Sequence, residues 1–165
     1  MTEDHVTHLA RRLGNLAKKR GIQIVAAESC TGGGVATAIT RISGSAKYFE
    51  RGFVTYTNIA KEEMLGVNKE TLMAHGAVSE QVAIEMAAGA LKHSHADVSV
   101  AVTGIAGPTG GVPGKPVGTV HFAWGVREGA IQARQFHFEG DRTAIRLQSV
   151  YVAIQGLIDL LRQPP

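Results

Sequence analysis

Cysteine and aromatic residues are scarce in this chain. Cys30 is the single cysteine among 165 residues, which excludes an internal disulfide and a zinc site built from several cysteines. Such a chain suits a reducing compartment, so we expect a cytoplasmic protein. Aromatic residues make up only 5% of the chain, which leaves little material for the platforms on which nucleic-acid bases stack.

Long apolar runs and dense patches of one charge are missing as well. No uninterrupted apolar stretch approaches the ~18 residues of a membrane span, and the N-terminus carries Glu3 and Asp4 and lacks the apolar core of a signal peptide. The net charge of +3 comes from scattered basic residues. We therefore expect no membrane and no nucleic acid as partner, and a small anionic ligand instead.

Strand-like and helix-like patterns alternate along the chain, as in an α/β protein. The length predicts one domain over residues 1–165. Strands are expected at 22–27, 52–57 and 97–103, and a hairpin at 117–126 and 130–138. Helices are expected at 4–20, 35–42, 59–65, 68–75, after Ser79 and from Asp141 onward, with Asn58, Asn68 and Ser79 as N-caps. This order predicts a three-layer α/β/α sandwich with a mostly parallel mixed sheet and an antiparallel hairpin near the C-terminus.

The chain lacks the familiar cofactor-binding sequence motifs. The run Gly110–Pro116 has neither the spacing of a P-loop nor the Ser or Thr that must follow its lysine. No G-x-G-x-x-G follows a predicted strand, and the seven histidines form no H-E-x-x-H. We therefore expect neither a dinucleotide fingerprint nor a metal. In a sheet of this kind, chemistry is expected in the turns that follow the carboxyl ends of the strands.

Ser29 stands at the first of these turns, where a buried strand is predicted to break into a helix. The residues Thr31, Gly32 and Gly33 follow, and their backbone N–H groups at a helix start could bind an oxyanion or a phosphate. Alternatively, Ser29 is only a helix cap before a tight glycine turn. Cys30 is a rival nucleophile, because the same helix dipole activates a thiol.

A serine nucleophile needs a base, and Lys61 is the candidate. It would lie in the first turn of the helix capped by Asn58, where the dipole and burial both favour a neutral amine. Tyr56 precedes it and could assist proton transfer. The alternatives are a surface lysine and a half-buried strand tyrosine. Arg142, at the start of the last helix, suits an anion site, or is simply a solvated arginine.

Several segments, in order, resemble the CinA C-terminal domain family. They are AESCTGG at 27–33, GFVTYTNIAK at 52–61, LGV at 65–67, HGAVSE at 75–80, TGIAGP at 103–108, KPVGTV at 115–120 and GDR at 140–142. They run from about residue 20 to the final helix and are highly specific as a set. Within the family the chain most resembles the stand-alone nicotinamide-nucleotide amidohydrolases.

The resemblance implies hydrolysis of the carboxamide of nicotinamide mononucleotide to nicotinate mononucleotide and ammonia. It implies Ser29 as nucleophile, Lys61 as base and Tyr56 as assistant, with no metal or organic cofactor, in a homo-oligomer, most simply a dimer. The expected substrate contacts are Cys30, Thr31, Gly32, Gly33, Thr103, Gly104 and Arg142. The alternative function is a non-catalytic nucleotide-binding or regulatory module of the same family, which would have no use for a neutral lysine. A phosphotransferase is a weaker candidate, since the P-loop and an acidic magnesium pair are absent.

Overall fold

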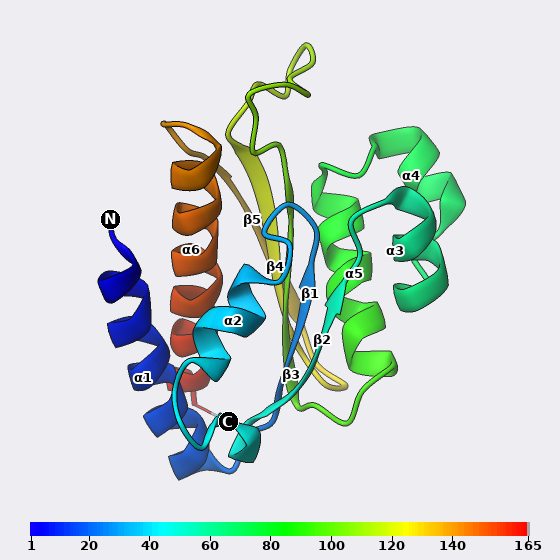
Figure 1. The fold of residues 1–165 in the computed structure, drawn as a ribbon. Coiled ribbons are helices and arrows are strands. Elements are labelled where there is room, and N and C mark those ends of the chain that lie inside the picture. The colour runs from blue at the N-terminus through cyan, green and yellow to red at the C-terminus, as the bar shows by residue number, and fades with distance from the viewer. Residues whose placement is uncertain (165) are drawn as a thin grey trace.

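A five-stranded mixed sheet forms the centre of the computed structural model, which describes residues 1–164 (Figure 1). Its strands lie in the order β2-β1-β3-β4-β5. They are β1 (Ile24–Glu28), β2 (Phe49–Val54), β3 (Val98–Gly104), β4 (Thr119–Val126) and β5 (Ile131–His137). The strand β1 is parallel to β2 and β3, whereas β4 is antiparallel to β3 and β5. The predicted mixed sheet with an antiparallel hairpin is confirmed.

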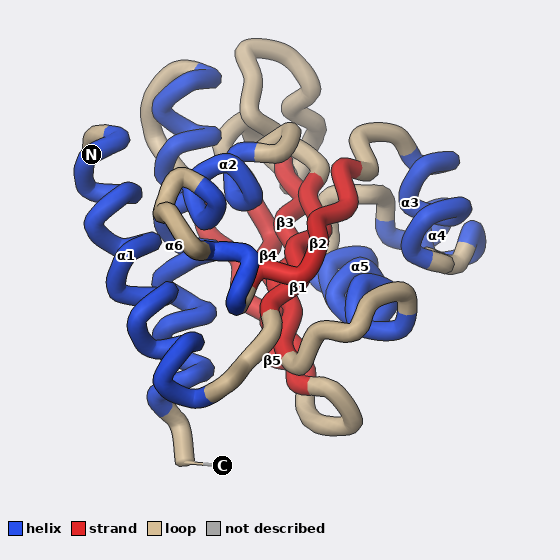
Figure 2. Tube along the Cα trace, turned by 60° about the horizontal axis from the view of Figure 1, so that its bottom comes forward, coloured by secondary structure: helices blue, strands red, loops and turns tan. Residues whose placement is uncertain are grey.

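Helices cover both faces of the sheet, which confirms the predicted three layers (Figures 1 and 2). The first layer contains α1 (Glu3–Arg20), α2 (Gly34–Thr40) and α6 (Arg142–Arg162). The opposite layer contains α3 (Asn58–Leu65), α4 (Lys69–His75) and α5 (Glu80–Lys92). A short 3₁₀ turn, η1 (Ser45–Lys47), precedes β2.

Alternate residues of the central strands pack into different layers. In β1, Ile24 and Ala26 join the core beneath α1 and α6, whereas Val25 and Ala27 join the core beneath α5. Successive strand side chains point to opposite faces, so a strand covered on both sides is buried at every position. All five residues of β1 are buried. This explains why the segment reads in the sequence as one continuous apolar run.

The boundaries of β2 and α3 differ from the predicted ones. The strand expected at 52–57 lies at Phe49–Val54, because its pairing with β1 stops where β1 stops, at Glu28 opposite Val54. The next three residues form a turn, and Thr57 caps α3 by accepting a hydrogen bond from the Ala60 N–H (3.2 Å). The prediction that Asn58 is the N-cap is therefore wrong.

Two further caps and one helix end bear on the predictions. Ser79 caps α5 as expected, with its hydroxyl accepting from the Val82 N–H (3.2 Å). Asn68 occupies the N-cap position of α4, but its side chain makes no capping bond there. The helix α2, expected to reach Ile42, ends at Thr40 before the left-handed turn at Gly44.

The last helix, α6, is long and apolar. By length and composition alone it could cross a membrane. Half of its most apolar window is buried inside the protein, where it packs on α1, α2 and the sheet. This burial is typical of the core helix of a globular domain, so the absence of a membrane partner stays our prediction.

We predict that Gly156→Ala destabilises the protein. Alanine ordinarily favours a helix over glycine by about 1 kcal/mol. Here, however, a Cβ atom would lie 2.1 Å from the Trp124 ring, which is stacked on Phe122 and bonded to the Ala153 carbonyl. Overpacking of this kind costs about 1–3 kcal/mol, so urea denaturation should show a lower free energy of unfolding. The same change in a Trp124→Leu background should lose most of this penalty; an equal penalty there would contradict the explanation.

Candidate active site

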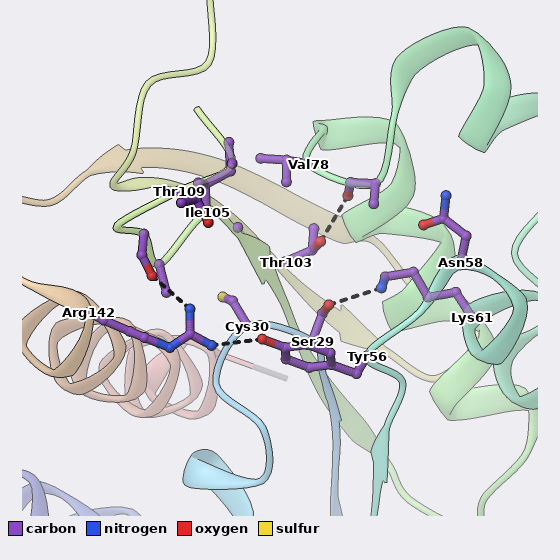
Figure 3. Close-up of a pocket in the computed structure, with 15 residues that line it drawn as sticks. Ser29, Cys30, Tyr56, Asn58, Lys61, Val78, Thr103, Ile105, Thr109 and Arg142 are labelled. Carbon is purple, nitrogen blue, oxygen red and sulfur yellow. Dashed lines mark hydrogen bonds between the residues drawn. The ribbon is translucent and has the colours of Figure 1, made fainter. Parts of the chain in front are cut away.

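The carboxyl ends of β1, β2 and β3 meet around a cavity of about 260 Å³. Ser29 follows β1, Tyr56 follows β2, and the turn after Gly104 follows β3 (Figure 3). The first turn of α6 adds Arg142 from the neighbouring layer. Seven of the expected site residues line this cavity: Ser29, Cys30, Tyr56, Lys61, Thr103, Gly104 and Arg142.

Glu28, the last residue of β1, holds the turn that carries Ser29. Its fully buried carboxylate accepts hydrogen bonds from the Thr31 hydroxyl (2.6 Å) and from the Val35 (2.8 Å) and Ala36 (3.0 Å) N–H groups. The N-terminus of α2 is thus satisfied by the protein's own carboxylate. Glu28 therefore occupies the anion position at this helix start through the Val35 and Ala36 N–H groups, and not through the N–H groups of Thr31, Gly32 and Gly33 that were expected to bind a ligand.

Thr31, Gly32 and Gly33 do not line the Ser29 cavity. They line a second cavity of about 330 Å³ between α1, α2 and α6, next to Arg146. Gly32 and Gly33 have φ angles of +57° and +99°, so the turn itself demands glycine there. The Gly32 N–H donates to the Ser29 carbonyl (3.0 Å) and closes that turn. The structure therefore separates these three residues from the cavity in which we expected them.

Lys61 is the functional side chain with the most unusual environment. It is 1% exposed, and its Nζ lies 2.9 Å from Ser29 Oγ and 2.8 Å from the Thr55 carbonyl oxygen, to which it donates (Figure 3). Among the described residues no carboxylate forms an ion pair with it. Burial lowers the pKa of Lys61 from its usual 10.5 to about 8. The alternative of a surface lysine is therefore wrong.

Cys30 is poorly suited to be the nucleophile. Its side chain is 5% exposed, and burial raises the pKa of its thiol from 9.0 to about 12. The nearby Glu28 carboxylate acts in the same direction. Because the thiolate is the reactive form, desolvation outweighs the helix dipole that made Cys30 a candidate in the sequence.

Arg142 bridges two walls of the cavity. Its Nη2 donates to the Tyr56 hydroxyl (2.8 Å) and its Nη1 donates to the Gly107 carbonyl (2.8 Å), as Figure 3 shows. Tyr56 lies beyond the end of β2 and is 55% exposed, so it is not a half-buried strand residue. Within residues 1–164 no hydrogen bond joins Tyr56 to Ser29 or Lys61, and its assistance to proton transfer stays a prediction.

Thr103 and Gly104 shape the cavity wall. The Thr103 hydroxyl, 1% exposed, donates to the Ala77 carbonyl (2.8 Å) and so ties β3 to the turn before α5. A Cβ on Gly104 would lie 2.8 Å from the Thr119 carbonyl oxygen, so β4 leaves no room for a side chain. The hydrogen bond to Ala77 accounts for a threonine at position 103, and the lack of space accounts for a glycine at position 104. Neither residue requires a ligand contact to explain it.

Part of the cavity wall was not expected from the sequence. Asn58, Val78, Ile105, Ala106 and Thr109 also line it. They lie in loops or at a helix start, where no periodic pattern marks them. The long glycine-rich segment after Thr103 was a general signal that this loop has a function.

Metal ligands were not expected from the sequence. Among residues 1–164, no group of three or more His, Cys, Asp or Glu side chains is arranged to hold a metal ion. The cavity presents a hydroxyl, an amine, a thiol and a guanidinium instead. These groups suit acid–base and nucleophilic chemistry on a polar organic substrate.

The chain matches known proteins along nearly its whole length. The family model described as "CinA C-terminal domain" matches residues 6–161. "Nicotinamide-nucleotide amidohydrolase PncC" of Escherichia coli strain K12 is 52% identical over 157 residues, covering 95% of each chain. The protein of the same name from Pseudomonas putida is 48% identical, covering 95% of this chain and 98% of its own. The crystal structure of the competence/damage inducible protein CihA from Agrobacterium tumefaciens superposes with a TM-score of 0.93 at 49% identity, covering 96% of both chains.

We predict that the buried Lys61 makes stability depend on pH. Between pH 8 and 10.5 the unfolded chain keeps a proton on Lys61 that the folded chain has released, so the wild-type free energy of unfolding rises with pH. Below pH 8 the folded protein bears the full free-energy cost of burying the protonated Lys61 amine. A pKa change from 10.5 to about 8 corresponds to at most about 3 kcal/mol. The stability advantage of Lys61→Met over the wild type should therefore shrink as the pH rises through this window.

The measurement is a set of urea denaturation curves from pH 7 to 10.5. Lys18→Met, which removes an exposed lysine from α1, controls for the loss of one positive charge. Constant effects of the substitution, such as the unpaired Thr55 carbonyl, cancel in the pH dependence. A Lys61→Met difference that stays flat from pH 7 to 10.5 would show that the amine is not desolvated in the folded protein.

Proposed function

The chain belongs to the CinA C-terminal domain family, and from this premise we propose that it is a nicotinamide-nucleotide amidohydrolase with a Ser–Lys mechanism. The reaction is hydrolysis of the carboxamide of nicotinamide mononucleotide to nicotinate mononucleotide and ammonia. The observation that carries the mechanism is the Lys61 amine, which is buried 2.9 Å from the Ser29 hydroxyl and, within residues 1–164, has no carboxylate partner. The amidohydrolases that bear this name are about half identical to the chain over nearly its full length.

In the first half of the reaction Ser29 is the nucleophile. The neutral Lys61 amine takes the Ser29 hydroxyl proton while Oγ attacks the carboxamide carbon. The resulting tetrahedral oxyanion collapses, the carbon–nitrogen bond breaks, and the Lys61 ammonium returns its proton to the leaving nitrogen. Ammonia leaves, and the nicotinate carbonyl remains attached to Ser29 as an ester.

In the second half a water molecule takes the place of the ammonia that has left. Lys61, neutral again, takes a proton from water as the water oxygen attacks the ester carbon. The bond between that carbon and Ser29 Oγ breaks, and the proton on Lys61 returns to Ser29. The sum is one amide and one water converted to one acid and one ammonia. The hydrogen bond from Lys61 to the Thr55 carbonyl aims the amine at Ser29 through both halves.

Backbone N–H groups in the loop after β3 are candidates for the oxyanion site. Ala106 and Gly107 line the cavity, and among the described residues no acceptor is recorded for their N–H groups. Fixed donors of this kind stabilise charge that develops in the transition state. The oxyanion site would then lie in the loop after β3, and not in the turn of Thr31, Gly32 and Gly33.

Arg142 is our candidate for the contact with the substrate phosphate. It lines the cavity, and its two bonds to the Tyr56 hydroxyl and the Gly107 carbonyl leave further N–H donors on the guanidinium. Charge-assisted bonds from arginine to phosphate are strong and directional. Tyr56 would help hold that guanidinium in place, as well as assist proton transfer.

A binding module without turnover fits the site less well. Burying a lysine amine disfavours its charged form, and a binder of an anionic nucleotide would gain from that charge. A low lysine pKa beside a serine hydroxyl is useful to an enzyme. We also keep the cytoplasmic location and the homodimer as predictions; the single, buried cysteine is consistent with a reducing compartment.

We predict that Ser29→Ala abolishes hydrolysis and spares the fold. Ammonia release from nicotinamide mononucleotide should fall by at least about a thousandfold, because the nucleophile is lost. Binding of the nucleotide, measured by calorimetry, should persist, since only one hydroxyl is removed. Cys30→Ala is the matched control and should keep most of the activity. The opposite pattern, an active Ser29→Ala beside an inactive Cys30→Ala, would make Cys30 the nucleophile.

We predict that Lys61→Arg is as inactive as Lys61→Met. Arginine keeps a positive charge but cannot accept a proton near neutrality. In the wild type, kcat/KM should rise with pH through about 8, because the base acts in its neutral form. Stopped assays of ammonia release from pH 6 to 10 check both statements, with circular dichroism to confirm folding. Substantial activity in Lys61→Arg would mean that the residue only attracts the substrate.

A further inference from the structure

The buried carboxylate of Glu28 takes part in neither half of the proposed reaction. It is completely buried and lies outside the cavity lining, and no lysine, arginine or histidine of the described residues pairs with it. Its charge is compensated by three hydrogen bonds, one from the Thr31 hydroxyl and two from backbone N–H groups in the first turn of α2. A buried charge is tolerated only with such compensation, so this arrangement is specific to a carboxylate.

The short helix α2 depends on this carboxylate. It has seven residues, begins at Gly33 as N-cap, and has no side-chain capping bond of its own. Glu28 supplies the missing cap from the end of β1, across the whole turn that carries Ser29. The Ser29 turn is therefore clamped at both ends, by β1 and by the start of α2.

The main chain of the same residue holds the base. The Glu28 carbonyl accepts a hydrogen bond from the Thr55 N–H (2.8 Å), and the Thr55 carbonyl accepts the bond from Lys61 Nζ (2.8 Å). Glu28 thus directly precedes Ser29 in the chain, and two hydrogen bonds through Thr55 connect it to Lys61 Nζ.

We propose that Glu28 is a positioning residue that sets the distance between Ser29 Oγ and Lys61 Nζ. The proposal rests on the proposed Ser–Lys mechanism and adds to it a residue that touches neither substrate nor reacting atoms. Proton transfer requires the two atoms to stay near the observed 2.9 Å. Misplacement of a catalytic group by about 1 Å can lower the rate roughly a hundredfold.

Glu28→Gln tests this role with a nearly isosteric change. The glutamine carbonyl oxygen can replace one carboxylate oxygen, but its NH₂ group would face a backbone N–H of Val35 or Ala36, donor against donor. The start of α2 should then shift and move the Ser29 turn. We expect kcat for ammonia release to fall about 10- to 100-fold while KM stays within about twofold, because Arg142, the proposed phosphate contact, is held by Tyr56 and Gly107 outside this turn.

Glu85→Gln is the matched control. Glu85 in α5 also accepts three hydrogen bonds, from the Asn68 N–H (2.8 Å), the Asn68 side-chain amide (3.0 Å) and the Thr71 hydroxyl (2.6 Å). It holds the start of another seven-residue helix, α4, and does not line the cavity. The melting temperature of Glu85→Gln should fall, as should that of Glu28→Gln, but the kcat of Glu85→Gln should stay within about twofold of the wild type.

A second readout does not depend on the substrate. A fluorophosphonate reagent labels Ser29 at a rate set by the reactivity of its hydroxyl, and intact-mass spectrometry follows the labelling, with Ser29→Ala as the blank. Labelling should slow by about the same factor as kcat in Glu28→Gln and stay unchanged in Glu85→Gln. Wild-type protein that is labelled at Ser29 but releases no ammonia from the nucleotide would refute the proposed substrate alone.

Two results would overturn the positioning role. One is a Glu28→Gln variant with wild-type kcat and wild-type labelling. The other is a loss of kcat of the same size in Glu85→Gln at a comparable melting temperature, which would reduce the effect of Glu28 to general stability. A kcat loss in Glu28→Gln alone, with KM preserved, supports the proposal.

Discussion

A lysine amine held out of water is the constraint on which the proposed chemistry of this protein depends. Lys61 is buried beside Ser29 and makes one further bond, to the Thr55 carbonyl. Desolvation favours the neutral amine and brings its pKa to about 8. The fold must therefore seal the carboxyl edge of the sheet on both sides while leaving a cavity for the substrate. Lys61 itself belongs to α3, in the layer that α3, α4 and α5 form on one face of the sheet.

Glu28 and Lys61 show two treatments of a buried ionisable group within one site. The Glu28 carboxylate has three donors, so its charge is supported and it serves the structure. The Lys61 amine has two oxygen neighbours and, among residues 1–164, no carboxylate in an ion pair, so its charge is poorly supported, as the proposed role of a base requires. Hydrogen bonds through Thr55 connect the two residues, and in our proposal the fixed position of Glu28 keeps Lys61 Nζ near Ser29 Oγ.

Much of this site could be predicted from local sequence. A continuous apolar run followed by Ser29 and three glycines predicts a strand, a turn and a helix, because each feature depends on neighbouring residues. The pairing of Ser29 with Lys61 was a hypothesis from helix position, chemical need and the family resemblance, whereas composition alone favoured a surface lysine. The limits of β2 were predicted three residues too late, because the end of an edge strand is set by its partner, which no local pattern reveals.

The sequence by itself determined the α/β class, the order of the elements, the strand-end turns and the residue types able to act as nucleophile and base, since periodicity and turn chemistry are local properties. Only the tertiary structure decided which of those groups meet. It buries Lys61 beside Ser29, and it buries Cys30 so that the pKa of its thiol rises. It also places the Glu28 carboxylate at the start of α2, while Thr31, Gly32 and Gly33 line another cavity. The physical reason is that burial and hydrogen-bond partners depend on residues 7 to 35 or more positions away, brought together only when the layers pack.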